Sequence, residues 1–100
     1  MAKGYWIASI DVQNMDGYRA YIAANGAVFH KYGARFVVRG GAFEANEGPA
    51  RSRNVVIEFK DYATALACYH SPEYQALIKA RGPHSNGEIV IIEGYDGPQP

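Results

Sequence analysis

The order of secondary structure constrains the fold of this chain more than any other feature, because one strand–helix–strand pattern occurs twice. A helical stretch fills the first and the third gap between four strand-like segments: Trp6–Val12, Arg35–Phe43, Val55–Phe59 and Glu88–Tyr95. In a chain of 100 residues this order predicts a single split-βαβ sandwich. Right-handed crossovers then give one antiparallel sheet in the order 4-1-3-2, with both helices on the same face.

Alternation along the strands predicts one apolar and one mixed face for this sheet. In the first strand the even-numbered residues are wholly apolar and face the helices, whereas Ile7, Ser9 and Asp11 lie on the opposite face. That mixed face also carries aliphatic residues of the other strands: Val37, Val56 and either Val90 or Ile92. Because no helix covers them and such surface is unfavourable in a monomer, we expect a homodimer whose sheets pack face to face.

Capping and breaking residues predict the bounds of the helices. Asn14 is a suitable N-cap for the first helix, and Gly33 suits the positive φ that ends it. The buried stripe of this helix has spacings of three and four: Tyr18, Tyr21, Ile22, Asn25, Val28, Phe29 and Tyr32. Asp61 caps the second helix, which breaks and restarts at Ser71-Pro72 and stops at Gly82-Pro83.

Charge and cysteine content argue against several classes of function. Ten basic and ten acidic residues cancel, so nothing electrostatic favours nucleic acid or an anionic membrane as partner. Cys68 is the only cysteine, which rules out an intramolecular disulfide, and we expect it to be buried and inert. The N-terminus shows no signal-peptide pattern, and no apolar run approaches the ~20 residues of a membrane span. We therefore expect a cytoplasmic protein with one domain over residues 1–95 and a flexible tail over 96–100.

A cluster of charged and polar residues is expected on the mixed face. A tight hairpin centred near Gly48-Pro49 would place Arg39 opposite Glu58 as a cross-strand ion pair, with Ser9 and Asp11 on the neighbouring strand. Arg39 offers a planar fork of donors to a small carboxylate or enol, and Glu58 or Asp11 in a poorly solvated site can act as a base. The alternative is that these charges only satisfy one another and fix the register of the dimer.

Residues near the helix break complete the candidate site. His70 lies beside Tyr69 and can titrate near neutrality, so it could exchange protons with a ligand at the mouth of a barrel. The end of a helix is also an ordinary, non-catalytic place for a histidine. We expect Glu58, Asp11 and His70 to be catalytic, and we expect four residues to contact the ligand: Arg39, Tyr69, Ser9 and Tyr74.

Other residues that could belong to a site have simpler structural explanations. Arg35 and Arg53 lie near strand ends and are expected to be solvated surface charges, with the alternative that either one guards an entrance. Gly40-Gly41 predicts a bulge or a close backbone approach rather than a phosphate loop, because no helix follows it. Three scattered histidines and one cysteine have no metal-ligand spacing, so we expect no metal and no cofactor.

Five ordered stretches between Lys3 and Tyr95 resemble a family of small bacterial proteins known as domain of unknown function 1330. They are Gly4-Tyr5-Trp6-Ile7-Ala8, Lys31-Tyr32-Gly33-Ala34-Arg35-Phe36, Val38-Arg39-Gly40-Gly41, Val56-Ile57-Glu58-Phe59 and Ser71-Pro72-Glu73-Tyr74-Gln75. The resemblance implies a ferredoxin-like βαββαβ fold of the dimeric α/β-barrel group, and it implies no particular reaction. The wider group includes cofactor-independent monooxygenases, isomerases, haem-binding enzymes and plain ligand binders.

Three hypotheses about function follow. The first is a homodimeric α/β-barrel protein with a small-molecule cavity in each subunit, acting as a cofactor-independent monooxygenase- or isomerase-like enzyme. The alternative is a non-enzymatic dimeric scaffold for ligand binding or regulation, which a cavity too small for an organic molecule would favour. A third, haem binding through His70, rests on membership of the wider group alone. The sequence leaves open whether the protein is an enzyme.

Overall fold

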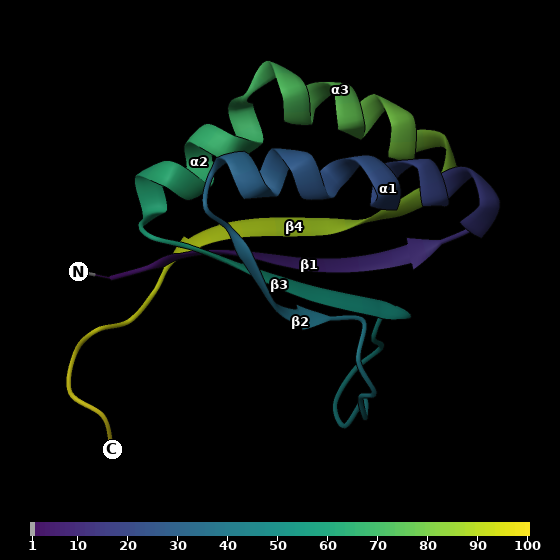
Figure 1. Ribbon diagram of the computed structural model, residues 1–100. Helices are drawn as coiled ribbons and strands as arrows, with labels where there is room; N and C mark the ends of the chain where they lie inside the picture. Colours follow the sequence, from purple (N-terminus) through teal and green to yellow (C-terminus); the bar gives the residue numbers. More distant parts are fainter. Residues whose placement is uncertain (1) are drawn as a thin grey trace.

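The computed structural model describes residues 2–100 and contains the expected two strand–helix–strand units (Figure 1). Its elements are β1 (Gly4–Val12), α1 (Met15–Lys31), β2 (Arg35–Arg39), β3 (Arg53–Phe59), α2 (Tyr62–His70), α3 (Pro72–Arg81), the 3-10 turn η1 (Gly82–His84) and β4 (Ser85–Glu93). The sheet has the order β2-β3-β1-β4, and each neighbouring pair is antiparallel. This is the predicted 4-1-3-2 order counted from the other edge, so the ferredoxin-like α+β fold is confirmed.

The predicted caps set the helix bounds. The side chain of Asn14 accepts a hydrogen bond from the Gly17 amide at 3.2 Å, and Gly33 adopts φ +67° after the end of α1. At the break between α2 and α3, the Ser71 hydroxyl accepts from the Tyr74 amide at 3.2 Å and donates to the Cys68 carbonyl at 2.7 Å. No helix within residues 2–100 has the length and hydropathy needed to cross a membrane.

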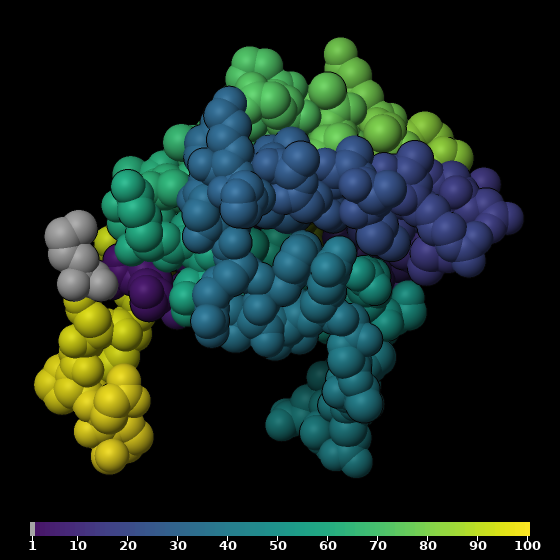
Figure 2. Space-filling view, viewed as in Figure 1, coloured from purple at the N-terminus to yellow at the C-terminus, as the bar shows by residue number. Residues whose placement is uncertain are grey.

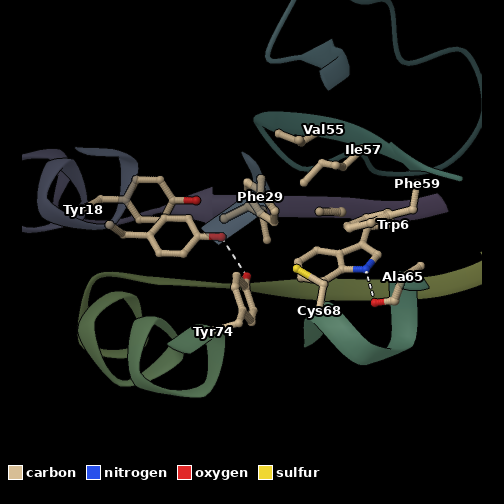
Figure 3. Close-up of a cluster of buried hydrophobic side chains, with 12 residues drawn as sticks. Trp6, Tyr18, Phe29, Val55, Ile57, Phe59, Ala65, Cys68 and Tyr74 are labelled. Carbon is tan, nitrogen blue, oxygen red and sulfur yellow. Dashed lines mark hydrogen bonds between the residues drawn. The ribbon is translucent and has the colours of Figure 1, made fainter. Parts of the chain in front are cut away.

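The core lies between the sheet and the helices and is built around Trp6 (Figure 3). The Trp6 indole N–H donates to the Ala65 carbonyl at 2.9 Å, so its one polar group is satisfied. The rings of Phe29 and Tyr74 contact it edge-on, with centroids 5.3 and 4.7 Å away. Cys68 is buried as expected, and burial raises the pKa of its thiol to about 12.

The second strand differs from the prediction in two ways. It ends at Arg39 rather than Phe43, because Gly40 turns the chain with φ +65°. The irregularity in its pairing falls at Val37 rather than at Gly40-Gly41: Phe36 pairs with Ile57, but Val38 pairs with Val56. One extra residue in β2 moves every later side chain to the opposite face.

The face of the sheet away from the helices is uncovered (Figure 1). A row of aliphatic residues crosses all four strands on this face through direct register partners: Val38, Val56, Ile7 and Val90. Ile7 is 44% exposed and Val90 is 52% exposed. The loop over residues 40–52 and the C-terminal segment over residues 94–100 project from this side, and Figure 2 shows the open gap between them.

Candidate functional site

A cavity of about 30 Å³ lies between the helices and the sheet, on the opposite side of the sheet from the predicted residues Ser9, Asp11 and Glu58. Its walls are mostly apolar and include the side chains of Trp6, Phe29, Phe36 and Tyr74. Trp6 and Tyr74 are fully buried, whereas Arg39 in the same lining is exposed, so the cavity reaches solvent beside Arg39. An apolar hollow with a few polar groups is typical of small-molecule sites.

Three arginines from three elements line this cavity. Arg39 ends β2, Arg53 begins β3 and Arg81 ends α3. The guanidinium carbon of Arg39 lies 4.0 Å from the centroid of the Phe36 ring, and that of Arg81 lies 5.6 Å from the centroid of the Tyr21 ring. No aspartate or glutamate of the described chain belongs to the lining. The charged part of the cavity is therefore wholly positive, which favours an anion.

The turn at Gly40 gives Arg53 its place at the cavity. The Gly40 amide donates to the Asn54 carbonyl at 2.8 Å, which closes the turn between β2 and the start of β3. A Cβ atom at position 40 would lie only 2.7 Å from Arg53 Nη1, and its backbone would be strained at φ +65°. The positive φ of the turn thus favours glycine at this position, whereas the close atom of Arg53 is the far end of a flexible side chain that can move aside.

Three buried polar atoms in the lining have no hydrogen-bond partner among residues 2–100. They are Asn25 Oδ1, Arg53 Nε and Arg81 Nε. Leaving a buried polar group unpaired costs roughly 1–3 kcal/mol, so native structures rarely keep such groups without water or a ligand. One acceptor and two donors of this kind are thus left for water molecules, or for a rearrangement of the lining, to satisfy.

The tyrosines of the cavity are held in their neutral form. The hydroxyl groups of Tyr21 and Tyr74 lie 2.7 Å apart in a hydrogen bond (Figure 3). Burial raises the pKa of both phenols, and it raises the pKa of Tyr18 against the opposing positive charges of Arg53 and Arg81. These phenols can donate hydrogen bonds at neutral pH but cannot serve as bases there.

The predicted residues Glu58, Asp11 and Ser9 lie on the uncovered face, outside the cavity. Glu58 pairs with the guanidinium of Arg35 at 3.2 Å and accepts from the Tyr5 hydroxyl at 3.2 Å. Ser9 donates to the Asn54 side chain at 3.3 Å. Asp11 binds Arg51 at 2.8 Å and the Ser52 amide at 3.0 Å, some distance along β1 from Tyr5. Their catalytic and binding roles stay predictions.

The predicted ion pair between Arg39 and Glu58 is wrong. The register places Arg35 opposite Glu58 and Arg39 opposite Val55, a buried residue on the helix side. The extra residue at Val37 causes this change, because it turns Arg39 from the uncovered face toward the cavity. Arg39 therefore lines the cavity together with Arg53 and Arg81 instead of facing an acidic residue, and its predicted role in ligand binding stays a prediction.

The residues predicted near the helix break stay in contact, since the Tyr69 ring meets both His70 and Tyr74, but only Tyr74 reaches the cavity. Tyr74 lines the cavity, whereas His70 is exposed and meets the edge of the Tyr69 ring at 5.2 Å. Tyr69 packs against Trp6, with ring centroids 5.7 Å apart, and lies outside the cavity lining. Within the part of the chain that is described, no group of three or more His, Cys, Asp or Glu residues could hold a metal ion.

Sequence reasoning missed Arg81 and Asn25 as cavity residues, and it offered Arg53 only as an alternative guard of an entrance. Arg53 is only partly exposed rather than a free surface charge, since its Nε atom is buried. Arg81 sits at the end of a helix, where a basic residue is commonplace. Asn25 did carry a signal, because it is an amide within an otherwise mostly aromatic and aliphatic helix stripe.

Solved structures with the same fold include proteins with and without an assigned activity. RPA0582, a protein of unknown function from Rhodopseudomonas palustris, aligns with a TM-score of 0.74 at 15% identity over 96% of this chain and 85% of its own. SnoaB, a cofactor-independent oxygenase from Streptomyces nogalater, aligns with a TM-score of 0.68 at 12% identity over 97% of both chains. A dimeric ferredoxin-like protein of unknown function from Thermobifida fusca aligns with a TM-score of 0.59 at 15% identity over 92% of this chain and 89% of its own. At these identities the likeness concerns the fold alone.

Sequence comparison places the chain more narrowly. None of the curated proteins is similar enough in sequence to match. The model of one family, the Domain of unknown function (DUF1330), matches residues 3–95, which is nearly the whole chain. The chain therefore belongs to the DUF1330 family.

Proposed function

We propose that this protein binds a small organic anion in the cavity between its helices and its sheet. The observation that carries the proposal is the set of Arg39, Arg53 and Arg81 around an apolar hollow whose lining, within residues 2–100, holds no carboxylate. Partly buried positive charges without counter-charges are costly, and a bound carboxylate or enolate relieves that cost. Guanidinium groups also bind such anions through paired, charge-assisted hydrogen bonds.

The size of the cavity decides how a ligand enters it. A volume of about 30 Å³ accepts only water-sized occupants, since one water needs roughly 10–15 Å³ by this measure, and a cavity of this size favours the non-enzymatic alternative. Arg39 is exposed and has a long, flexible side chain, so moving it from the mouth is cheap. We infer that an organic anion displaces the arginine side chains outward and then pairs with them.

The cavity lining also limits the chemistry that can follow binding. Its phenols are neutral and its guanidiniums are charged at neutral pH, so no group of the described lining is a base at that pH. A ligand must therefore arrive already ionised, and the arginines stabilise its negative charge. This suits a binding protein, and it also suits an enzyme whose substrate ionises in water. SnoaB, the cofactor-independent oxygenase, supports the second case only through its shared fold.

We also propose that the protein is a homodimer formed through the uncovered sheet face. The aliphatic row through Ile7 and Val90 is flanked by polar partners such as Glu58 and Ser9, a pattern of apolar centre and polar rim. The dimeric ferredoxin-like protein from Thermobifida fusca supports this assembly through its fold. The cavity lies on the other side of the sheet, so ligand binding does not require the interface.

A titration followed by tryptophan fluorescence tests the anion site. Trp6 is the only tryptophan and lines the cavity, so its emission reports binding there. We expect benzoate to change this emission in a saturable way and the neutral isostere benzamide to bind far more weakly. Arg53→Gln should weaken benzoate binding by about 10-fold or more, because a hydrogen bond to a charged group contributes roughly 1.5–3 kcal/mol.

The matched control is Arg19→Gln. Arg19 lies exposed on α1, pairs with Asp16 and is outside the cavity lining, so this change removes one positive charge without touching the site. Equal loss of affinity in both variants would mean that only net charge matters. Equal binding of benzoate and benzamide, or no binding of either, would overturn the proposal.

A further inference from the structure

We propose that the two copies of the homodimer are related by a two-fold axis that runs across the strands, so that the acidic loop over residues 40–52 of each copy lies against a basic corner of its partner's sheet. The inference rests on the proposed pairing through the uncovered face, and it adds which parts of the two copies meet. It is carried by the places of the charges and of the projecting segments on that face.

The two segments that project from the uncovered face stand at diagonally opposite corners of the sheet (Figure 1). The loop over residues 40–52 lies on the β2 side, at the end of the sheet where Arg53 pairs with Ile10. The C-terminal segment follows β4 at the other edge, at the end where Glu93 pairs with Gly4. A two-fold axis along the strands or across them therefore places both segments of a second copy at the two free corners. The shape of this face is thus self-complementary, as an interface between two identical chains requires.

One of the free corners, at the start of β2, is basic. Arg35 begins β2 there, and Lys3 directly precedes β1. These two cations share one carboxylate, since Glu58 lies 3.2 Å from Arg35 and 4.0 Å from Lys3. The side chain of Arg35 is 71% exposed, so this corner keeps a positive charge in excess and donors that a partner can reach.

The opposite end of the uncovered face is acidic. Two carboxylates on β1 and β4, those of Asp11 and Glu88, share the single guanidinium of Arg51. The loop adds to this negative charge, because residues 40–50 include two glutamates and no basic residue. One of them, Glu47, lies next to the turn at Gly48, is exposed, and forms no ion pair within residues 2–100.

These charges distinguish the two possible axes, whereas the aliphatic row does not, because either axis stacks the row of one copy on that of the other. An axis along the strands would lay the acidic loop of each copy over the partner's Glu88, and like charges brought together at an interface are costly. An axis across the strands lays the loop over the partner's Arg35 instead. It also brings the basic end of each sheet over the acidic end of the other. Electrostatic complementarity therefore selects the second arrangement, in which Glu47 faces the partner's Arg35.

The test reverses these two charges singly and together and measures the dissociation constant of the dimer by analytical ultracentrifugation at low ionic strength. We expect Arg35→Glu and Glu47→Arg each to weaken the dimer about 10-fold, and the double variant to return to within about 3-fold of wild type. Arg35 begins β2 and Glu47 lies in the loop after its other end, so such recovery reports contact between copies and not within one copy. If Arg35→Glu does not fold, Lys3→Glu takes its place in the same scheme.

The matched control combines Arg19→Glu with Glu47→Arg, which gives the same net charge as the double variant but places the new acid on α1. It should stay as weak as Glu47→Arg alone. Single variants that dissociate like wild type, or a double variant weaker than both, would overturn the arrangement. So would a Glu47→Arg dimer tighter than wild type, which is the result expected for an axis along the strands. In these cases the homodimer itself stands, whereas a monomeric wild-type protein removes the proposed pairing and this inference with it.

Discussion

Among single residues, the hydrogen-bonded phenols Tyr21 and Tyr74 offer the clearest energetic test of the core. Both are buried, and their hydroxyl oxygens are 2.7 Å apart. Tyr74→Phe leaves the Tyr21 hydroxyl without this partner, so we expect it to lower the free energy of unfolding by about 1–3 kcal/mol. The double variant Tyr21→Phe/Tyr74→Phe should cost less than the two single changes added together, because it leaves neither hydroxyl behind. Urea unfolding followed by circular dichroism measures all three.

The exposed hydroxyl of Tyr95 provides the control for this cycle. It donates to the Pro98 carbonyl at 2.7 Å near the C-terminus, where water can replace the bond. Tyr95→Phe should therefore change stability by less than about 0.5 kcal/mol. Strict additivity of the two core variants would contradict the pairing of Tyr21 with Tyr74.

Among the connecting elements, the loop over residues 40–52 depends on one anchor. Arg51 binds Glu88 through two nitrogens at 3.0 and 2.6 Å and binds Asp11 at 2.8 Å, while Asp11 also accepts from the Ser52 amide at 3.0 Å. These contacts fix the end of a loop that otherwise projects from the uncovered face (Figure 1). We expect Asp11→Ala to speed trypsin cleavage after Arg51, whereas Glu44→Gln, a change in the same loop, should not. Equal cleavage rates would show that the anchor does not restrain the loop.

The same anchor predicts a pH dependence. The backbone amide of Ser52, followed by the guanidinium of Arg51, lowers the pKa of Asp11 below its ordinary value. A lowered pKa in the folded state adds stability that is complete above the ordinary aspartate value of about 3.9 and is lost as the pH falls through the folded-state pKa. The difference in unfolding free energy between wild type and Asp11→Asn should therefore be constant near neutrality and vanish in strong acid. A difference that grows as the pH falls would contradict this assignment.

The order of elements could be predicted from the sequence. Which side of the sheet the last residues of β2 lie on could not. Caps and breakers such as Asn14 and Ser71 act locally, so their signals survive in the sequence and the helix bounds were correct. The extra residue at Val37 leaves no such signal. Val37 and Val38 are both valines, so the sequence pattern looks the same whichever of the two lies on the uncovered face. The neighbouring Gly40-Gly41 pair led to a bulge being predicted there instead of at Val37. For this reason the predicted partner of Arg39 was wrong, although its expected affinity for a carboxylate stays a prediction.

At the scale of the whole molecule, that one extra residue serves both faces of the sheet. It turns Arg39 toward the cavity and brings Val38 into line with Val56, which completes the aliphatic row on the uncovered face. Without the shift, the charge of Arg39 would lie beside this row and the cavity would lose its exposed arginine. The two proposed roles, anion binding and pairing with a second copy, are thus consequences of the same local irregularity on opposite sides of one layer.

The pairing of two copies can be tested separately from ligand binding. We expect wild-type protein to have about twice the 11.0 kDa mass of one chain in light scattering after size exclusion. Val90→Glu places a charge in the row opposite Ile7 and should reduce the mass to that of one chain, because a buried unpaired carboxylate is very costly. Met15→Glu makes the same change at an exposed apolar residue of α1, away from the row, and should leave the mass as it is. A wild-type monomer, or a Val90→Glu variant that is still a dimer, would contradict pairing through this face. If the monomeric Val90→Glu variant still binds benzoate, the two functions lie on independent sides of the sheet.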